Sequence, residues 1–439
     1  MDAKLYKLEN SILCRLKGKF VNVHDEKEKA MMINSMAKAI EADLSSDEIK
    51  QVVDDINNFA PIGNMISDED IEDIMINNVS NIFVQSAKEG SKKLGIKIGS
   101  KEELERFVNK LKLYATNETA HGNILDVHLP NGSRTNIISS PLGYDVTIRN
   151  FKHTPLSILD LVNLKALNYE MAARLWLYVD GLKVRPANLL IGGMPASGKT
   201  TLLNAMFSFF RPEMRIVSIE ETYELNTEVH ENCVRLETSH EMSMEDLVKN
   251  ALRMKPDMII IGEVRGAEAN DMITAMNVGK IAIGTIHASS TRDIINRLMH
   301  TPMNVPKDIV QVLDALIIVS TIHATGNRPY RAITQISEIS GMETQVLLSD
   351  LYKFDYRTLK GSQILPSVTY RDTMARLLSI TPSDILTEER VRAAVLEKMN
   401  MLGKRDMKSI SEMVKLYYDN PDALCTKLGM GSISPVVRV

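Results

Sequence analysis

Cysteine is scarce in this chain. Its 439 residues include three cysteines, Cys14, Cys233 and Cys425, and these lie far apart. Such a spacing predicts neither a disulfide framework nor a zinc knuckle. It is consistent with a reducing cytosol as the simplest location.

Long hydrophobic runs and a strong charge of one sign are also lacking. No apolar run approaches the roughly 18 residues that a membrane-spanning helix needs, and the first residues are too charged for a signal peptide. We therefore expect that the chain does not itself cross a membrane. A formal net charge of −4, with 25% charged and 44% hydrophobic residues, gives no reason to expect a nucleic-acid surface. The length suggests two or three globular domains.

The strongest positive signal is a short loop with two glycines. Residues 193–200 read GMPASGKT, which matches the phosphate-binding pattern G-x-x-x-x-G-K-[ST] without a gap. The apolar residues 187–191 predict a buried strand before the loop, and residues 200–210 predict a helix after it. In such a loop, backbone N–H groups surround phosphate oxygens and the lysine provides a positive charge. The residues expected to bind the nucleotide are Gly193, Pro195, Ala196, Ser197, Gly198, Lys199, Thr200 and Thr201.

Carboxylates follow two of the downstream strands that the sequence predicts. Glu263 follows the apolar residues 258–262, while Glu220 and Glu221 end the strand predicted at 215–220. Ligands of parallel sheets bind at the carboxyl ends of strands, so Glu263 is a candidate for orienting water; the alternative is a solvated loop glutamate. Side chains alternate along a strand, so one of the other two carboxylates is expected to point into the site. For that pair the alternative is an acidic surface turn.

One histidine and three arginines complete the set of candidates. His287 follows the strand predicted at 281–285 and is placed to donate a hydrogen bond to a γ-phosphate oxygen, although a lone histidine is more often structural. Arg149, Arg253 and Arg265 are candidate charge donors to the phosphates, from the same copy or a neighbouring one. A surface ion pair is the alternative for each arginine.

The predicted secondary structure divides the chain into five segments. Residues 1–65 look helical and charged, and residues 66–150 predict an α+β domain that includes a hairpin turning at Asn131 and Gly132. After a linker at 151–165, residues 166–360 alternate between helices and apolar strands, which predicts a mostly parallel sheet wrapped by helices. Residues 361–439 predict a helical extension. Further elements expected are helices at 26–44, 243–254, 388–401 and 408–418, a helix beginning at Ser46, and strands at 71–77, 81–85, 124–129, 134–138, 144–149, 315–320 and 332–339.

Several ordered motifs together resemble the type II/type IV secretion ATPases, the hexameric motors that drive pili, archaella and secretion systems. The segments concerned are 252–268 (Walker B region), 216–225 (acidic box), 275–288 (histidine box), and 71–78 with 129–134 (N-terminal domain). The resemblance covers roughly residues 71–418. It implies an α/β fold in which a RecA-like motor domain follows a smaller α+β domain, with helical segments at both ends.

The resemblance also implies roles for individual residues. Glu263 would be the catalytic glutamate, with Glu220 and Glu221 in the acidic box and His287 near the γ-phosphate. Thr200, Glu220 and Glu263 would hold Mg²⁺, partly through water. Arg149 lies in a TIRNF segment similar to the family's T-I-R-K-F and would lie beside the nucleotide at an inter-domain cleft, although asparagine replaces the motif's lysine.

Some features narrow the resemblance. Residues 301–306 and 404–420 look like the archaeal branch, which includes archaellum motors and pilus-assembly ATPases, and residues 338–354 are similar to Tad-like pilus ATPases. The four-cysteine zinc motif of bacterial type II secretion and pilus-extension ATPases is absent. Lys280 and Ala282 depart from the T-G-H-x-G start of the histidine box. Lysine keeps a positive charge without a switchable proton, so turnover is expected to be slower.

The resemblance implies ATP and Mg²⁺ as ligands, and a homo-oligomer of six subunits as the assembly. A polytopic membrane platform protein would be the direct partner, filament subunits would be indirect partners, and no nucleic acid is expected. The location implied is the cytoplasm, at the inner face of the cell membrane. Three alternatives stay open: a DNA-transfer or protein-secretion motor, a nucleotide-regulated docking module with little turnover, and a P-loop kinase for a small molecule.

Overall fold

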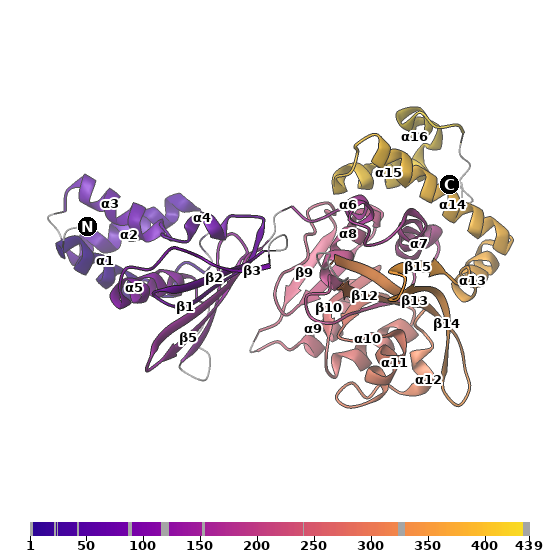
Figure 1. Cartoon of the computed structure of the whole chain (residues 1–439), viewed down its shortest axis with the longest axis horizontal. Coiled ribbons are helices and arrows are strands. Elements are labelled where there is room, and N and C mark those ends of the chain that lie inside the picture. Colours follow the sequence, from indigo (N-terminus) through magenta and orange to yellow (C-terminus); the bar gives the residue numbers. More distant parts are fainter. Residues whose placement is uncertain are drawn as a thin grey trace. The chain divides into compact units, whose positions relative to one another are not determined.

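The chain forms two compact units, Met1–Thr154 and Pro155–Val439. The computed structural model describes residues 3–21, 23, 25–41, 44–86, 90–115, 123–151, 154–239, 241–323 and 330–432, and Figure 1 shows their helices and strands. The division between the units falls inside the linker predicted at residues 151–165. In the described residues, no helix combines the length and the apolar character needed to cross a membrane.

The first unit packs helices onto one face of an antiparallel sheet. Its helices are α1 (Ala3–Arg15), α2 (Glu26–Ile40), α3 (Ser46–Asn57), α4 (Gly63–Ile66) and α5 (Lys101–Leu111). Its strands are β1 (Ile71–Asn78), β2 (Asn81–Ser86), β3 (Gly90–Lys93), β4 (Ile124–His128), β5 (Arg134–Ser140) and β6 (Gly143–Arg149). They lie in the order β3-β2-β1-β6-β5-β4. Ile74 and Ile148 of the sheet share a core with Ile12 and Phe107 of the helices, so the N-terminal helices belong to the same core as the sheet.

The local signals in this unit are confirmed. β4 and β5 pair as a hairpin, and Gly132 in its turn has φ +82°, a backbone conformation that favours glycine. A Cβ there would come within 3.0 Å of the Phe151 ring. α3 begins at Ser46 behind a capping box formed by Ser45 and Glu48. α2 ends at Ile40, earlier than predicted; residues 42–43 of that prediction lie outside the described residues.

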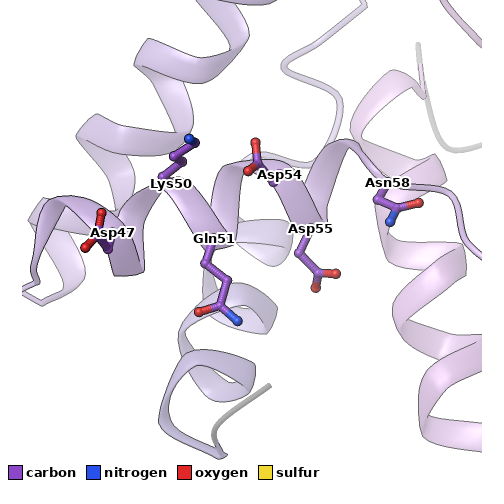
Figure 2. Close-up of a pocket in the computed structure, with 6 residues that line it drawn as sticks. All are labelled: Asp47, Lys50, Gln51, Asp54, Asp55 and Asn58. Atoms are coloured by element: carbon purple, nitrogen blue, oxygen red, sulfur yellow. The ribbon is translucent and has the colours of Figure 1, made fainter.

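An open pocket on α3 is polar and partly acidic. It is lined by Asp47, Lys50, Gln51, Asp54, Asp55 and Asn58 (Figure 2). Asp55 forms an ion pair with Arg106 of α5. None of the residues predicted to bind nucleotide lies in this pocket.

The second unit is built on a sheet of mixed direction. Its strands are β7 (Leu189–Gly192), β8 (Ile216–Glu220), β9 (Cys233–Glu237), β10 (Met258–Val264), β11 (Ile281–Ile286), β12 (Ala315–Ile322), β13 (Tyr330–Met342), β14 (Val346–Asp355) and β15 (Lys360–Gln363). They lie in the order β15-β14-β13-β12-β7-β11-β10-β8-β9. The pairs from β12 to β9 are parallel, and β13, β14 and β15 add antiparallel strands at one end. The predicted α/β class with a mostly parallel sheet is confirmed.

Helices cover both faces of this sheet. They are α6 (Ile158–Asn163), α7 (Tyr169–Asp180), α8 (Lys199–Met206), α9 (Met244–Ala251), α10 (Glu268–Asn277), α11 (Thr291–Met299), α12 (Lys307–Val310), α13 (Thr369–Leu378), α14 (Pro382–Met401), α15 (Met407–Asp419) and α16 (Pro421–Leu428). Leu189 and Ile191 of β7 face a core that includes α6–α8 and α13–α16, whereas Leu190 faces α9–α12. The sequence of a strand that is buried on both faces in this way is a continuous run of apolar residues.

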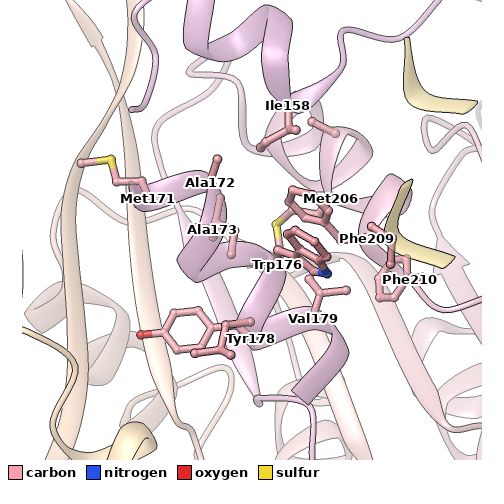
Figure 3. Close-up of a cluster of buried hydrophobic side chains, with 14 of the residues drawn as sticks. Ile158, Met171, Ala172, Ala173, Trp176, Tyr178, Val179, Met206, Phe209 and Phe210 are labelled. Atoms are coloured by element: carbon pink, nitrogen blue, oxygen red, sulfur yellow. The ribbon is translucent and has the colours of Figure 1, made fainter. Parts of the chain in front are cut away.

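The centre of the first of these cores is α7, whose residues are buried from Met171 to Asp180. Figure 3 shows Trp176 stacked on Phe209, with ring centroids 5.7 Å apart. Tyr417 of α15 meets the same indole edge-on at 4.9 Å. The C-terminal helices therefore share the core of the second unit.

Two expectations for the C-terminal part need correction. The helix predicted at 388–401 begins earlier, at Pro382, because Thr381 and Asp384 form a capping box there. The β14–β15 hairpin runs past residue 360, where the helical extension was expected to begin. The predicted helix at 243–254 is confirmed as α9 and a following 3-10 turn, with the expected capping box between Ser243 and Asp246.

A charged side chain lies within the aromatic core. Arg392 of α14 is fully buried and donates hydrogen bonds to Asp180 (2.9 Å) and Glu388 (2.8 Å). Its guanidinium lies 4.4 Å from the Trp176 ring centroid. A buried ion pair contributes little net stability, but removing one partner leaves a charge without compensation.

We expect Arg392→Leu to lower the free energy of unfolding by about 3–5 kcal/mol, because Asp180 and Glu388 lose their buried counter-charge. Urea denaturation measures this. The control is Arg390→Leu, two residues earlier on the exposed side of α14, with an expected change within about 0.5 kcal/mol. Equal effects of the two substitutions would contradict the assignment.

Candidate functional site

The phosphate-loop sequence lies between β7 and α8, near the middle of the sheet. β7 is flanked by β11 and β12, and α8 begins at Lys199. Gly198 has φ +101°. A Cβ on Gly193 would lie 2.5 Å from the carbonyl oxygen of Val319, so no larger residue fits there. The predicted order of strand, loop and helix is confirmed.

The loop has the features that a bound phosphate requires. No side chain caps the N-terminus of α8, which leaves backbone N–H groups and the helix dipole directed at an anion. Ser197 Oγ is buried and has no hydrogen-bond partner among the residues that the structure describes. Lys199 Nζ donates to the loop's own carbonyls, Gly193 O at 3.0 Å and Met194 O at 3.3 Å. These groups fit a nucleotide's phosphates.

The remaining predicted loop residues are more accessible. Pro195 and Ala196 are exposed, and Thr200 and Thr201 are half-buried in the first turn of α8. Burial lowers the pKa of Lys199, and the nearby charge of Glu263 opposes this change. A partly buried ammonium gains a strong interaction when an anion replaces carbonyl groups as its partner.

His287 and Glu263 lie beside the lysine. Lys199 Nζ is 3.3 Å from His287 Nδ1, and His287 Nε2 is 2.5 Å from Glu263 Oε1. His287 Nδ1 also lies 3.3 Å from the carbonyl oxygen of Gly193, so it is within reach of both a donor and an acceptor of the phosphate-loop segment. The ends of β10 and β11 thus meet the phosphate loop as the sequence predicts.

Arg265 links the two acidic segments. Its guanidinium contacts Glu263 Oε2 at 2.6 Å and Glu221 Oε2 at 2.9 Å. The predicted charge donor is therefore engaged by two carboxylates in this structure. Lys199, His287, Glu263, Arg265 and Glu221 form a continuous line of polar contacts.

Glu220 lies apart from this line. Its side chain is buried, at 2% exposed, and Oε2 accepts hydrogen bonds from the backbone N–H groups of Glu224 (2.7 Å) and Leu225 (2.9 Å). Burial raises its pKa to about 7 against these hydrogen bonds. Of the two acidic-box carboxylates, Glu221 is the one in contact with the site residues. Glu220 Oε1 has no hydrogen-bond partner among the described residues and lies 3.8 Å from Arg235, and the metal-binding role that the resemblance implied stays a prediction.

Two other candidates lie elsewhere in the second unit. Arg253 is exposed and contacts Asn250; the neighbouring Met254 carbonyl accepts a hydrogen bond from Arg215, which precedes β8. Arg253 thus lies at the amino ends of the strands, opposite the loop, so its expected role within one copy is corrected. Lys280 precedes β11, at the same opposite edge, and therefore does not contact the phosphate loop of its own chain.

Arg149 belongs to the first unit. It ends β6, pairs with Asp73 at 3.0 Å and has a largely exposed side chain. Its role beside the nucleotide stays a prediction.

Sequence reasoning missed Asn204 and Arg331. Asn204 of α8 bonds the backbone of the segment after Glu220, and an asparagine inside a helix is the signal that could have found it. Arg331 of β13 packs against Gly198, since a Cβ on Gly198 would lie 3.4 Å from its Cδ. That contact depends on strand pairing distant in the sequence.

No cluster of three or more histidine, cysteine, aspartate or glutamate side chains in the described ranges could hold a metal ion by itself. A Mg²⁺ ion held by phosphates, a hydroxyl and waters needs no such cluster.

The loop and the strand ends define a P-loop domain of the α/β class. A family model described as "Type II/IV secretion system protein" matches residues 55–341, and the chain belongs to this family. The uncharacterized protein MJ0900 of Methanocaldococcus jannaschii is 30% identical over 381 residues, which cover 83% of this chain and 68% of that protein.

Other relatives extend the comparison. The uncharacterized protein MJ0781 of the same archaeon is 37% identical over 228 residues, covering 49% of this chain; this chain spans 31% of its length. The conjugal transfer protein TrbB of Rhizobium radiobacter is 27% identical, with 63% of this chain and 86% of that protein covered. Among solved structures, the ATPase DotB of Yersinia pseudotuberculosis has a TM-score of 0.49 and 16% identity, covering 85% of this chain and 94% of that chain.

The raised pKa of Glu220 predicts a pH-dependent stability. A carboxyl whose pKa is about 7 when folded, against 4.5 as its ordinary value, binds its proton more tightly in the folded state. The contribution of Glu220 to stability is therefore greatest below pH 4.5 and falls by up to about 3 kcal/mol as the pH rises through 7.

We expect Glu220→Gln to remove this part of the pH dependence, as measured by urea denaturation between pH 4.5 and 7.5. Glu228→Gln, an exposed carboxylate later in the same connection, should keep the wild-type slope. Parallel profiles for wild type and Glu220→Gln would show that the carboxyl titrates normally.

Proposed function

We propose that this chain hydrolyses ATP as the motor of a type IV filament or secretion system. The proposal is based on the contacts that link Lys199, His287 and Glu263 beside the phosphate loop. Hydrolysis needs a cation at the transferred phosphate and a group that orients water, and these side chains are of the right kinds.

Each residue has a part in this proposal. Lys199 exchanges the loop carbonyls for β- and γ-phosphate oxygens, and Glu263 orients the attacking water. His287 lies between Lys199 and Glu263 and reports the state of the phosphate to Glu263. Thr200 would hold Mg²⁺, which supplies charge neutralisation on the phosphate oxygens.

The mechanical role is proposed from family membership. In this proposal six copies form a ring, Arg149 reaches the nucleotide from the N-terminal unit, and the ring works on a polytopic platform protein at the inner face of the membrane. Arg253, on the edge of the sheet away from its own loop, would act only on a neighbouring copy. The resemblance of residues 301–306 and 404–420 to the archaeal branch favours a pilus or archaellum as the product.

A DNA-transfer motor is the second candidate, supported by the conjugal transfer proteins among the relatives. A docking module with little turnover has less support, because Lys280, the substitution that motivated it, lies at the edge of the sheet opposite the phosphate loop.

We expect Glu263→Gln to lower the rate of ATP hydrolysis by about 100-fold or more while ATP binding persists, because an amide cannot take up a proton from water. Mg²⁺-dependent phosphate release and nucleotide binding are the two measurements. Glu228→Gln is the control and should hydrolyse at the wild-type rate. Equal, near-background rates in wild type and Glu263→Gln would contradict the motor and favour the docking module.

The cargo is tested with tagged Glu263→Gln, loaded with ATP and Mg²⁺ and recovered from membranes of the host. We expect a polytopic platform protein encoded beside pilin-like or archaellin-like subunits. Recovery of a DNA-transfer channel would support the second candidate instead. Lys199→Ala, which should not bind ATP, is the matched control.

A further inference from the structure

The segment between β8 and β9 carries exposed carboxylates. We call residues 221–226 the acidic loop. Glu221 in it contacts Arg265, and Glu224 is exposed.

Glu220 holds the acidic loop from inside the fold. One carboxylate oxygen accepts both backbone N–H groups of Glu224 and Leu225. The Glu220 side chain fills the space beside Gly262, where a Cβ would lie 3.1 Å from Glu220 Cγ. Gly262 immediately precedes Glu263, so the same side chain packs against the backbone that carries the proposed catalytic glutamate.

Asn204 holds the acidic loop from the phosphate-loop helix. Its Nδ2 donates to the carbonyl oxygen of Glu224 at 3.1 Å, and its Oδ1 accepts from the N–H of Asn226 at 2.7 Å. Asn204 lies on α8, which begins with Lys199. A shift of α8 would therefore move the acidic loop with it.

We propose that Glu220 and Asn204 are positioning residues, which hold the acidic loop against α8 so that Glu221 faces Arg265. Glu220 acts as a hydrogen-bond acceptor and not as a metal ligand or a base. The catalytic part rests on the proposed ATP hydrolysis. Fixed placement of charged groups around a phosphate accounts for much of the rate in such reactions.

Substitutions at the two anchors separate these roles. Glu220→Gln keeps a carbonyl acceptor for the two N–H groups, so kcat should stay within about threefold of wild type; Glu220→Ala should lose tenfold or more. Asn204→Ala, at a half-buried position where folding is not at risk, should also lose about tenfold in kcat. The Mg²⁺ concentration for half-maximal rate should stay within twofold in all of them.

A second measurement tests directly whether the acidic loop is held in place. Hydrogen exchange of the peptide covering residues 221–228 should be faster in Glu220→Ala and Asn204→Ala, and should match wild type in Glu220→Gln and in the control Glu228→Gln. The proposal is overturned if Glu220→Gln is as slow as Glu220→Ala and needs more Mg²⁺, since Glu220 is then a metal ligand or base. It is also overturned if Asn204→Ala leaves exchange and kcat unchanged.

The two proposals fail differently. If the wild-type protein releases no phosphate from ATP, the proposed function is wrong. The expected effects of the substitutions on kcat are then wrong as well. The exchange measurement still decides whether Glu220 and Asn204 anchor the loop.

Discussion

The parallel register of β10, β11 and β7 is the constraint on which the candidate site depends. Ile281 pairs with Met258 on one side, and Ile283 pairs with Leu189 on the other. Because parallel strands in this register end at one edge of the sheet, the residues that follow them converge. Lys199, His287 and Glu263 come from three separate segments and meet only for this reason.

Buried charges connect the C-terminal helices to the same sheet. Glu338, in the middle of β13, accepts hydrogen bonds from Tyr178 of α7 (3.0 Å) and from the backbone of Thr369 at the start of α13 (2.8 Å). A carboxylate at a helix N-terminus satisfies N–H groups that the helix leaves unpaired. With Arg392 between Asp180 and Glu388, these contacts restrict how α13 and α14 pack against the core of the second unit, at some cost in stability.

Local patterns predicted most of the second unit. The apolar runs at β8, β10, β11 and β12 were found because strands buried on both faces have few polar residues. β9, β14 and β15 were missed: β9 is half-buried throughout, β14 mostly half-buried and β15 fully exposed, so none of them is a continuous apolar run. The start of α14 was predicted six residues too late, at Glu388 instead of Pro382, because the capping box of Thr381 and Asp384 was not recognised.

In the candidate site too, local sequence patterns predicted some features and tertiary packing decided others. The sequence by itself determined the phosphate loop, because its glycines, lysine and threonine lie within eight consecutive residues and the local backbone alone sets their relative positions. It also determined that carboxylates end the neighbouring strands. Only the tertiary structure decided that Glu221 and not Glu220 reaches Arg265, and that Arg253 and Lys280 lie at the opposite edge. The direction of a side chain at a strand end depends on the residues packed around it. For Glu220, these are Gly262 and the turn at Glu224. Residues distant in the chain provide such packing, so the sequence alone does not show the direction.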